Sequence, residues 1–178
     1  MPSTSLRLIL SLFCIFLVKI LFLTYLPLVN DEAYAIAVSK DFSLSFLDHP
    51  PIGFWLSQIF NNFLEVNNPI LFRFPYLLCG IGTTFFLYKI GKELGGEKTG
   101  LWSALLYNIV PFYFLSGGFL VVPDGPLNLG ISLTAYSVLK IQKIPYEKQY
   151  QFLLILGISL ALSFASKYQG FLIAVGCL

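Results

Sequence analysis

The fold class is decided by residues 6–26, which read LRLILSLFCIFLVKILFLTYL. An α-helix rises 1.5 Å per residue, so about 20 apolar residues cross the hydrocarbon core of a bilayer. This stretch has that length, and Lys19 is the charge near its middle. It is longer than the apolar part of a cleavable signal peptide, which runs for about 7–15 residues. A retained transmembrane helix over residues 6–27 is therefore expected.

The composition of the whole chain extends this prediction. Hydrophobic residues make up 57% of the 178 residues and charged residues only 11%, whereas soluble domains carry about 25% charged residues. The sequence predicts an all-α, polytopic bundle of transmembrane helices that forms a single membrane domain over residues 1–178. The net charge of +2 and the lack of basic runs interleaved with aromatic residues argue against a nucleic-acid partner.

Further apolar stretches continue the pattern beyond the first span. Spans are expected over residues 70–94, 101–122, 127–144, 152–165 and 170–178. The last of these has only about half the length of a crossing. The chain is therefore expected to be a fragment of a longer enzyme or a natural truncation.

The segment between the first two spans has a different character. Residues 28–69 mix polar and charged positions with aromatic ones, so they are too polar to cross the bilayer and too apolar for a free loop. Two interfacial amphipathic helices are expected in this outer loop, over residues 32–40 and 52–64. The second follows Pro50-Pro51, and proline suits the first turn of a helix.

The distribution of Lys and Arg predicts the orientation. Seven of the eleven basic residues fall on one side of the expected spans, and this side should be cytoplasmic together with the N-terminus. Most acidic residues fall on the opposite side, which in a bacterial inner membrane is the periplasmic face. The seven basic residues are Arg7, Lys89, Lys92, Lys98, Lys140, Lys143 and Lys148.

Four acidic side chains on the outer side are candidates for a functional site. Asp31 and Glu32 follow the first span, where acids also favour a helix N-terminus through its dipole. Asp48 precedes a second helix start, and Asp124 lies in a Pro-Asp-Gly-Pro sequence that is equally typical of a turn. Each signal is weak alone, but the expected topology brings all four to one face, which favours a catalytic site there.

Three further side chains on that face are candidates for anion binding. His49 is the only histidine, although a lone histidine is more often structural than a ligand. Arg73 is either a snorkelling residue or a phosphate clamp, because guanidinium matches phosphate geometry. Lys167 interrupts an apolar run, and an ionisable residue at membrane depth is a functional candidate, with snorkelling as the alternative. Together they predict a lipid-phosphate-binding site.

An anion site beside carboxylates suits transfer of a sugar from a polyprenyl-phosphate carrier. Phosphate leaves readily once its charge is neutralised, so no strong general acid is needed. One general base then suffices to activate an acceptor hydroxyl or amine, unlike the carboxylate pair of most glycoside hydrolases. The expected partners are a polyprenyl-phosphate sugar donor, membrane lipid, and a glycan, lipid or protein acceptor.

Five short motifs occur in order along nearly the whole chain: Asp31-Glu32, Asp48-His49-Pro50-Pro51, Phe72-Arg73-Phe74-Pro75, Val122-Pro123-Asp124-Gly125-Pro126-Leu127 and Ser166-Lys167-Tyr168. The ordered set resembles the protein mannosyltransferase and aminoarabinose transferase group, which are membrane glycosyltransferases of the GT-C class. Members of this group run to several hundred residues, so the resemblance covers their N-terminal portion only.

The resemblance implies a role for each matching acid. Asp31 matches the aspartate regarded as the catalytic base, and Glu32 matches its acidic neighbour. Asp124 matches a second outer-loop aspartate that assists. These three residues are the catalytic set that the resemblance implies.

The resemblance also implies binding roles. His49 takes the position of a residue that contacts the lipid phosphate in some relatives, and Arg73 matches an arginine near the donor phosphate. Asp48 takes the position of an acid that binds a metal in some relatives. No cofactor is expected to be required, with a divalent metal at Asp48 as an option.

Two other functions stay open at this point. The chain is alternatively a non-catalytic membrane subunit that binds a lipid carrier, or an inactive truncated fragment. A small channel or transporter ranks last, because the sequence lacks the paired broken helices of transporters.

Overall fold

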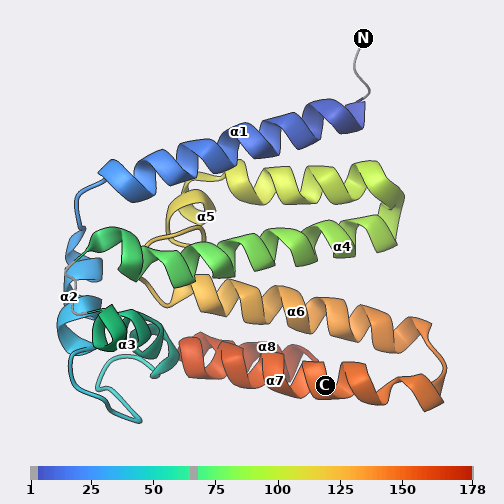
Figure 1. The fold of residues 1–178 in the computed structure, drawn as a ribbon. Coiled ribbons are helices and arrows are strands. Elements are labelled where there is room, and N and C mark those ends of the chain that lie inside the picture. Colours follow the sequence, from blue (N-terminus) through green and yellow to red (C-terminus); the bar gives the residue numbers. More distant parts are fainter. Residues whose placement is uncertain (1–3, 65–67, 178) are drawn as a thin grey trace.

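The structure is a computed structural model that describes residues 4–64 and 68–177. Every element assigned within these ranges is a helix, which confirms the predicted all-α class. Figure 1 shows long helices lying side by side, with α2 and α3 gathered at one end of the bundle. That end is where α1 finishes and where α4 and α6 begin.

Among the described residues, two helices are long and apolar enough to cross a membrane, namely α1 (Thr4–Tyr25) and α4 (Pro69–Ile109). A third apolar helix, α7 (Tyr150–Ser166), is shorter. The predicted multi-pass arrangement in a bilayer stays a prediction. The remaining elements are α2 (Asn30–Val38), α3 (Ile52–Leu64), α5 (Pro111–Leu115), α6 (Asp124–Lys143), η1 (Tyr146–Lys148), η2 (Tyr168–Gly170) and α8 (Phe171–Gly176).

Helix α4 consists of two halves that lie side by side, as Figure 1 shows. The chain reverses at Gly95-Gly96, where both residues leave helical geometry and Gly96 has a φ of 83°. Only glycine adopts this region at little cost. The turn falls where the two neighbouring apolar stretches were expected to separate.

The second half of α4 ends earlier than the stretch expected over residues 101–122. Its last helical residue is Ile109, and Val110 is extended with a ψ of 120°. The cause is Pro111, since a proline disfavours the helical region for the residue before it. The short helix α5 and an irregular segment follow, and they lead to Asp124 at the start of α6.

Helices form at both places in residues 28–69 where the sequence predicted them. The first begins at Asn30 and ends at Val38, two residues earlier than expected, and the second starts at Ile52 directly after Pro50-Pro51. Their position at a membrane interface stays a prediction.

One core cluster holds this end of the bundle together. It joins Ala35 of α2, Phe54 of α3, Phe72 and Tyr76 of α4, and Val121 of the segment before α6. Each of these side chains is buried. Because the cluster unites four separate segments, it fixes their relative positions around the site described below.

The first half of α4 packs closely against the segment that follows α5. A Cβ at Gly80 would lie 2.7 Å from the carbonyl oxygen of Gly118 and 3.0 Å from that of Gly117. We expect Gly80→Ala to lower the free energy of unfolding by about 1–3 kcal/mol, the usual cost of overpacking. Thermal unfolding in detergent measures it.

Gly157→Ala is the matched control for this change. Gly157 lies inside α7, and a Cβ there has no atom within 4 Å. The control is expected to be neutral or stabilising by up to about 1 kcal/mol, because alanine is the better helix former. Equal unfolding temperatures for the two variants would show that the backbone around Gly80 accommodates the added Cβ without a loss of stability.

Candidate active site

A cavity of about 290 Å³ opens at the end of the bundle where α2, α3 and α4 meet the segment before α6. Its wall includes Tyr34, Ala35, Gly53, Phe54 and Tyr76 alongside charged residues. Five of the seven site residues predicted from the sequence line this cavity, and these are Asp31, Asp48, His49, Asp124 and Lys167.

Asp31 and Glu32 point in different directions although they are neighbours in the chain. Successive residues of an α-helix are rotated by about 100° around its axis. Asp31 in the first turn of α2 is exposed and lines the cavity, whereas Glu32 is completely buried beneath the helix. Among the side chains that the structure describes, those of residues 4–59 and 68–177, the carboxylate of Asp31 has no hydrogen bond or ion pair.

Asp48 and His49 lie on the segment that leads into α3. The His49 Nδ1 atom is 3.0 Å from the Asp48 carboxylate, and the ring of His49 meets the ring of Phe54 edge-on. Desolvation alone raises the pKa of Asp48, but its contacts with His49 and Tyr34 outweigh this and hold the pKa below its ordinary value. The contact with Asp48 correspondingly raises the pKa of Tyr34.

Asp124 and Lys167, which also line the cavity, form an ion pair across 3.0 Å. Asp124 is the first residue of α6, and Lys167 directly follows the last residue of α7. These helices are antiparallel neighbours, as Figure 1 shows, so their start and end meet at the same end of the bundle. Buried serines of α7, such as Ser159 and Ser163, let the helices approach closely.

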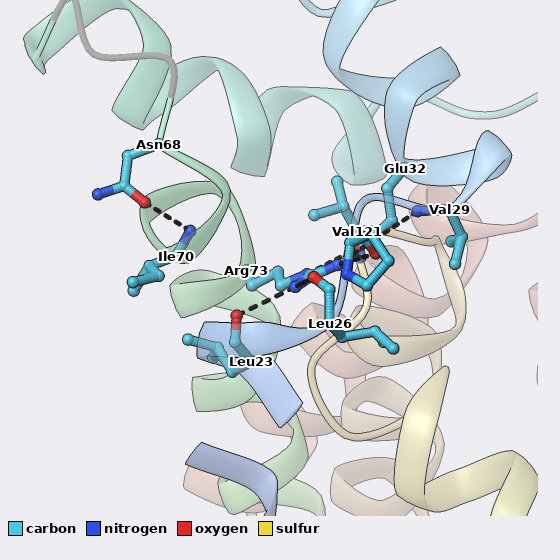
Figure 2. A network of polar contacts seen from close by, with 9 residues as sticks. Leu23, Leu26, Val29, Glu32, Asn68, Ile70, Arg73 and Val121 are labelled. Carbon is cyan, nitrogen blue, oxygen red and sulfur yellow. Dashed lines mark hydrogen bonds and ion pairs between the residues drawn. The ribbon is translucent and has the colours of Figure 1, made fainter. Parts of the chain in front are cut away.

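Arg73 is not among the residues that line the cavity. Figure 2 shows its side chain between Glu32 and the backbone of Leu23 and Leu26. Its side chain is completely buried. Nη1 donates to the carbonyl oxygens of Leu23 at 3.0 Å and Leu26 at 2.8 Å, and Nη2 donates to that of Pro27 at 3.1 Å. Nε and Nη2 donate to the two carboxylate oxygens of Glu32 at 2.8 and 2.5 Å. The five N–H groups of a guanidinium are thereby all used.

Glu32 binds two backbone amides besides Arg73. Its Oε2 atom accepts from the N–H of Val29 at 3.2 Å, which closes the first turn of α2. Its Oε1 atom accepts from the N–H of Val121 at 3.1 Å, from a segment 89 residues further along the chain. The carboxylate of Glu32 therefore links the start of α2, α4 and the segment before α6, and Arg73 extends this link to the end of α1.

The expected roles of Glu32 and Arg73 stay predictions, but the structure shows which partners their polar atoms already have. Arg73 was expected near the donor phosphate, but each of its N–H groups already has a protein acceptor. Glu32 was expected to share in proton transfer, but both of its oxygens are occupied by donors. The reason is burial, because a buried charge persists only when it is paired and hydrogen-bonded.

The metal option at Asp48 has no further support from the geometry. Within the part of the chain that the structure describes, no group of three His, Cys, Asp or Glu side chains is placed to hold an ion.

Sequence reasoning missed two tyrosines of the cavity wall. Tyr34 lies one helical turn after Asp31 on α2, and it contacts Asp48. Tyr76 lies one turn after Arg73 on α4, completely buried, and its hydroxyl donates to the carbonyl oxygen of Gly53. The spacing of three residues from a predicted site residue is the signal that could have found both.

Comparison with known families assigns the class of protein. The family model for dolichyl-phosphate-mannose-protein mannosyltransferase, a family of membrane glycosyltransferases, matches residues 48–178. The chain belongs to this family. No curated protein and no solved structure matches the chain.

The matched range contains most of the cavity but not all of it. Asp48, His49, Asp124 and Lys167 lie within residues 48–178, whereas Asp31 precedes them. The fold brings Asp31 into the same cavity through the core cluster and through Glu32.

Proposed function

We propose that this chain transfers a sugar from a polyprenyl-phosphate-linked donor to an acceptor hydroxyl or amine, with Asp31 as the general base. The observation that carries the proposal is the pairing of the carboxylates at this end of the bundle. Asp48 contacts His49, Asp124 pairs with Lys167 and Glu32 pairs with Arg73. Asp31 alone lines the cavity with a carboxylate that the described residues leave unpaired.

An unpaired carboxylate suits the base role for a simple reason. A paired carboxylate loses an ion pair when it takes up a proton, whereas an unpaired one does not. In the proposed step, Asp31 takes the proton from the acceptor hydroxyl or amine while the acceptor atom bonds to the anomeric carbon of the sugar. The bond from that carbon to the carrier phosphate breaks, and the electron pair leaves with polyprenyl phosphate.

The leaving phosphate is an anion, so its departure needs positive charge nearby that neutralises it. Lys167 has one carboxylate partner for three N–H donors, so it retains donors for a phosphate. We assign phosphate binding to Lys167 and His49, which line the same cavity, and we assign to Asp124 the holding of Lys167. We assign no phosphate contact to Arg73, since its donors are used within the fold.

The proposed location rests on the distribution of the basic residues along the chain and on the membrane family to which the chain belongs. We place the cavity at the outer face of a bacterial inner membrane, with the N-terminus in the cytoplasm and the chain crossing several times. The acceptor belongs to one of three classes: glycan, lipid or protein.

Membranes that contain the full-length protein test the proposal with dolichyl-phosphate [³H]mannose as the donor probe, followed by the glucosyl and aminoarabinosyl analogues. We expect one donor to pass its label to a glycan, lipid or protein acceptor that chromatography separates from the donor, and we expect transfer to continue in EDTA. Binding of the donors without turnover would favour the non-catalytic carrier-binding subunit instead.

A further inference from the structure

The first two turns of α4 carry two buried polar side chains that reach different walls of the cavity. Arg73 and Tyr76 lie three residues apart, so they occupy the same side of the helix. Both are completely buried. The guanidinium of Arg73 and the hydroxyl of Tyr76 each have hydrogen-bond partners within the fold. The helix is itself anchored at its start, where the side chain of Asn68 accepts from the N–H of Ile70 at 3.0 Å (Figure 2).

Arg73 holds the wall that carries Asp31. Its guanidinium binds three carbonyl oxygens at the end of α1 and the carboxylate of Glu32 on α2. Asp31 is the residue before Glu32, so a shift of Glu32 moves Asp31 with it. Glu32 also accepts a hydrogen bond from the N–H of Val121, and this bond holds the segment that leads to Asp124.

Tyr76 holds the wall that carries Asp48 and His49. Its hydroxyl donates to the carbonyl oxygen of Gly53 and accepts from the hydroxyl of Ser57, 2.9 Å away. Gly53 and Ser57 lie in the first two turns of α3, directly after the Asp48-His49 segment. Ser57 is also completely buried, so water does not replace this contact.

We propose that Glu32, Arg73 and Tyr76 are positioning residues of the transferase, which fix the distance between Asp31 on one wall and His49 and Asp124 on the others. This inference rests on the proposed function for its catalytic part. Its physical basis is that general acid–base catalysis requires reacting groups within hydrogen-bond reach, and small displacements are costly.

Two conservative variants of the full-length protein test the proposal. Tyr76→Phe removes only the hydroxyl that binds α3. Glu32→Gln keeps the shape but turns one acceptor oxygen into an NH₂ group, which faces a donor of Arg73 and the N–H of either Val29 or Val121. Tyr88→Phe is the matched control, because Tyr88 lies on the same helix but its hydroxyl bonds Glu97 and Lys92 near the Gly95-Gly96 turn.

Hydrogen exchange in nanodiscs supplies a measurement that needs no activity. Tyr76→Phe is expected to speed exchange over residues 52–59 by about fivefold to tenfold, the effect of one lost buried hydrogen bond. Glu32→Gln is expected to speed exchange over residues 29–35 and 119–123 instead. Tyr88→Phe is expected to change neither region.

Kinetics with dolichyl-phosphate [³H]mannose, or the analogue that the protein accepts, supply the second measurement. Both variants are expected to lower kcat by about tenfold or more, with the donor KM and the midpoint of the acidic limb of the pH profile unchanged. A raised donor KM with unaltered exchange would overturn the proposal, because the residues would then contact the donor. Loss of the acidic limb in Glu32→Gln would make Glu32 the base. A wild-type protein that transfers no sugar refutes the proposed function alone, and the exchange data still decide whether these residues hold the walls.

Discussion

Asp31→Asn in the full-length protein is expected to lower kcat for sugar transfer by about 10²- to 10⁴-fold, the usual contribution of a general base. Asparagine has nearly the same shape as aspartate but cannot take up the acceptor's proton. The carboxylate of Asp31 has no partner among the described side chains, so its replacement removes no hydrogen bond or ion pair among them. Insertion into the membrane and the unfolding temperature should therefore stay as they are in the wild-type protein.

Asp41→Asn provides the control for this measurement. Asp41 is also exposed and lies in the segment between α2 and α3, but it does not line the cavity. Its substitution should leave transfer unchanged. The rates are compared in the same membranes with the same labelled donor, at equal amounts of inserted protein. Transfer by Asp31→Asn at the wild-type rate would remove Asp31 from the base role.

Local signals in the sequence predicted most helix positions. The apolar stretch over residues 6–26 forms α1, and Pro50-Pro51 precedes α3 at Ile52 as expected. The early end of the α4 helix at Ile109 also has a local cause, Pro111, which an apolar-length argument overlooks. The positions of these helix ends depend on residues that are neighbours in the chain, and they can therefore be predicted from a single sequence.

The pairing of charges depends on contacts between distant segments. Asp124 and Lys167 are 43 residues apart and meet only because α6 and α7 are antiparallel. The sequence marked both as site residues but did not indicate that they pair. Their pairing changes the interpretation of the site, because Asp31 is then the cavity carboxylate that has no partner within the described part of the chain.

The same limit explains the different roles of Asp31 and Glu32. The sequence places two acids side by side in a first helical turn, where either could be the base. The choice depends on which face of α2 packs on α4, and Arg73 decides it from 41 residues away. A buried arginine needs a carboxylate, so the acid that faces inward becomes part of the fold and its neighbour stays available for chemistry.

Glu32→Leu is expected to lower the free energy of unfolding by about 3–5 kcal/mol, the largest stability effect among these predictions. Leucine fills a similar volume, but it leaves the guanidinium of Arg73 buried without its counter-ion. The N–H groups of Val29 and Val121 lose their acceptor as well. Unfolding in mixed micelles with a denaturing detergent measures the change. Glu147→Leu, the same substitution at an exposed site in η1, should stay within about 0.5 kcal/mol of the wild type.

The double variant Glu32→Leu/Arg73→Met separates the charge from the remaining contacts of the pair. It removes the uncompensated buried charge, so it should be more stable than Glu32→Leu alone. It should still be less stable than the wild type, because the carbonyl oxygens of Leu23, Leu26 and Pro27 lose the donors of Arg73. Equal losses in the single and double variants would mean that the unpaired guanidinium reaches water. In that case the ion pair joins the two walls through packing and hydrogen bonds, and its charge contributes nothing to the stability of the fold.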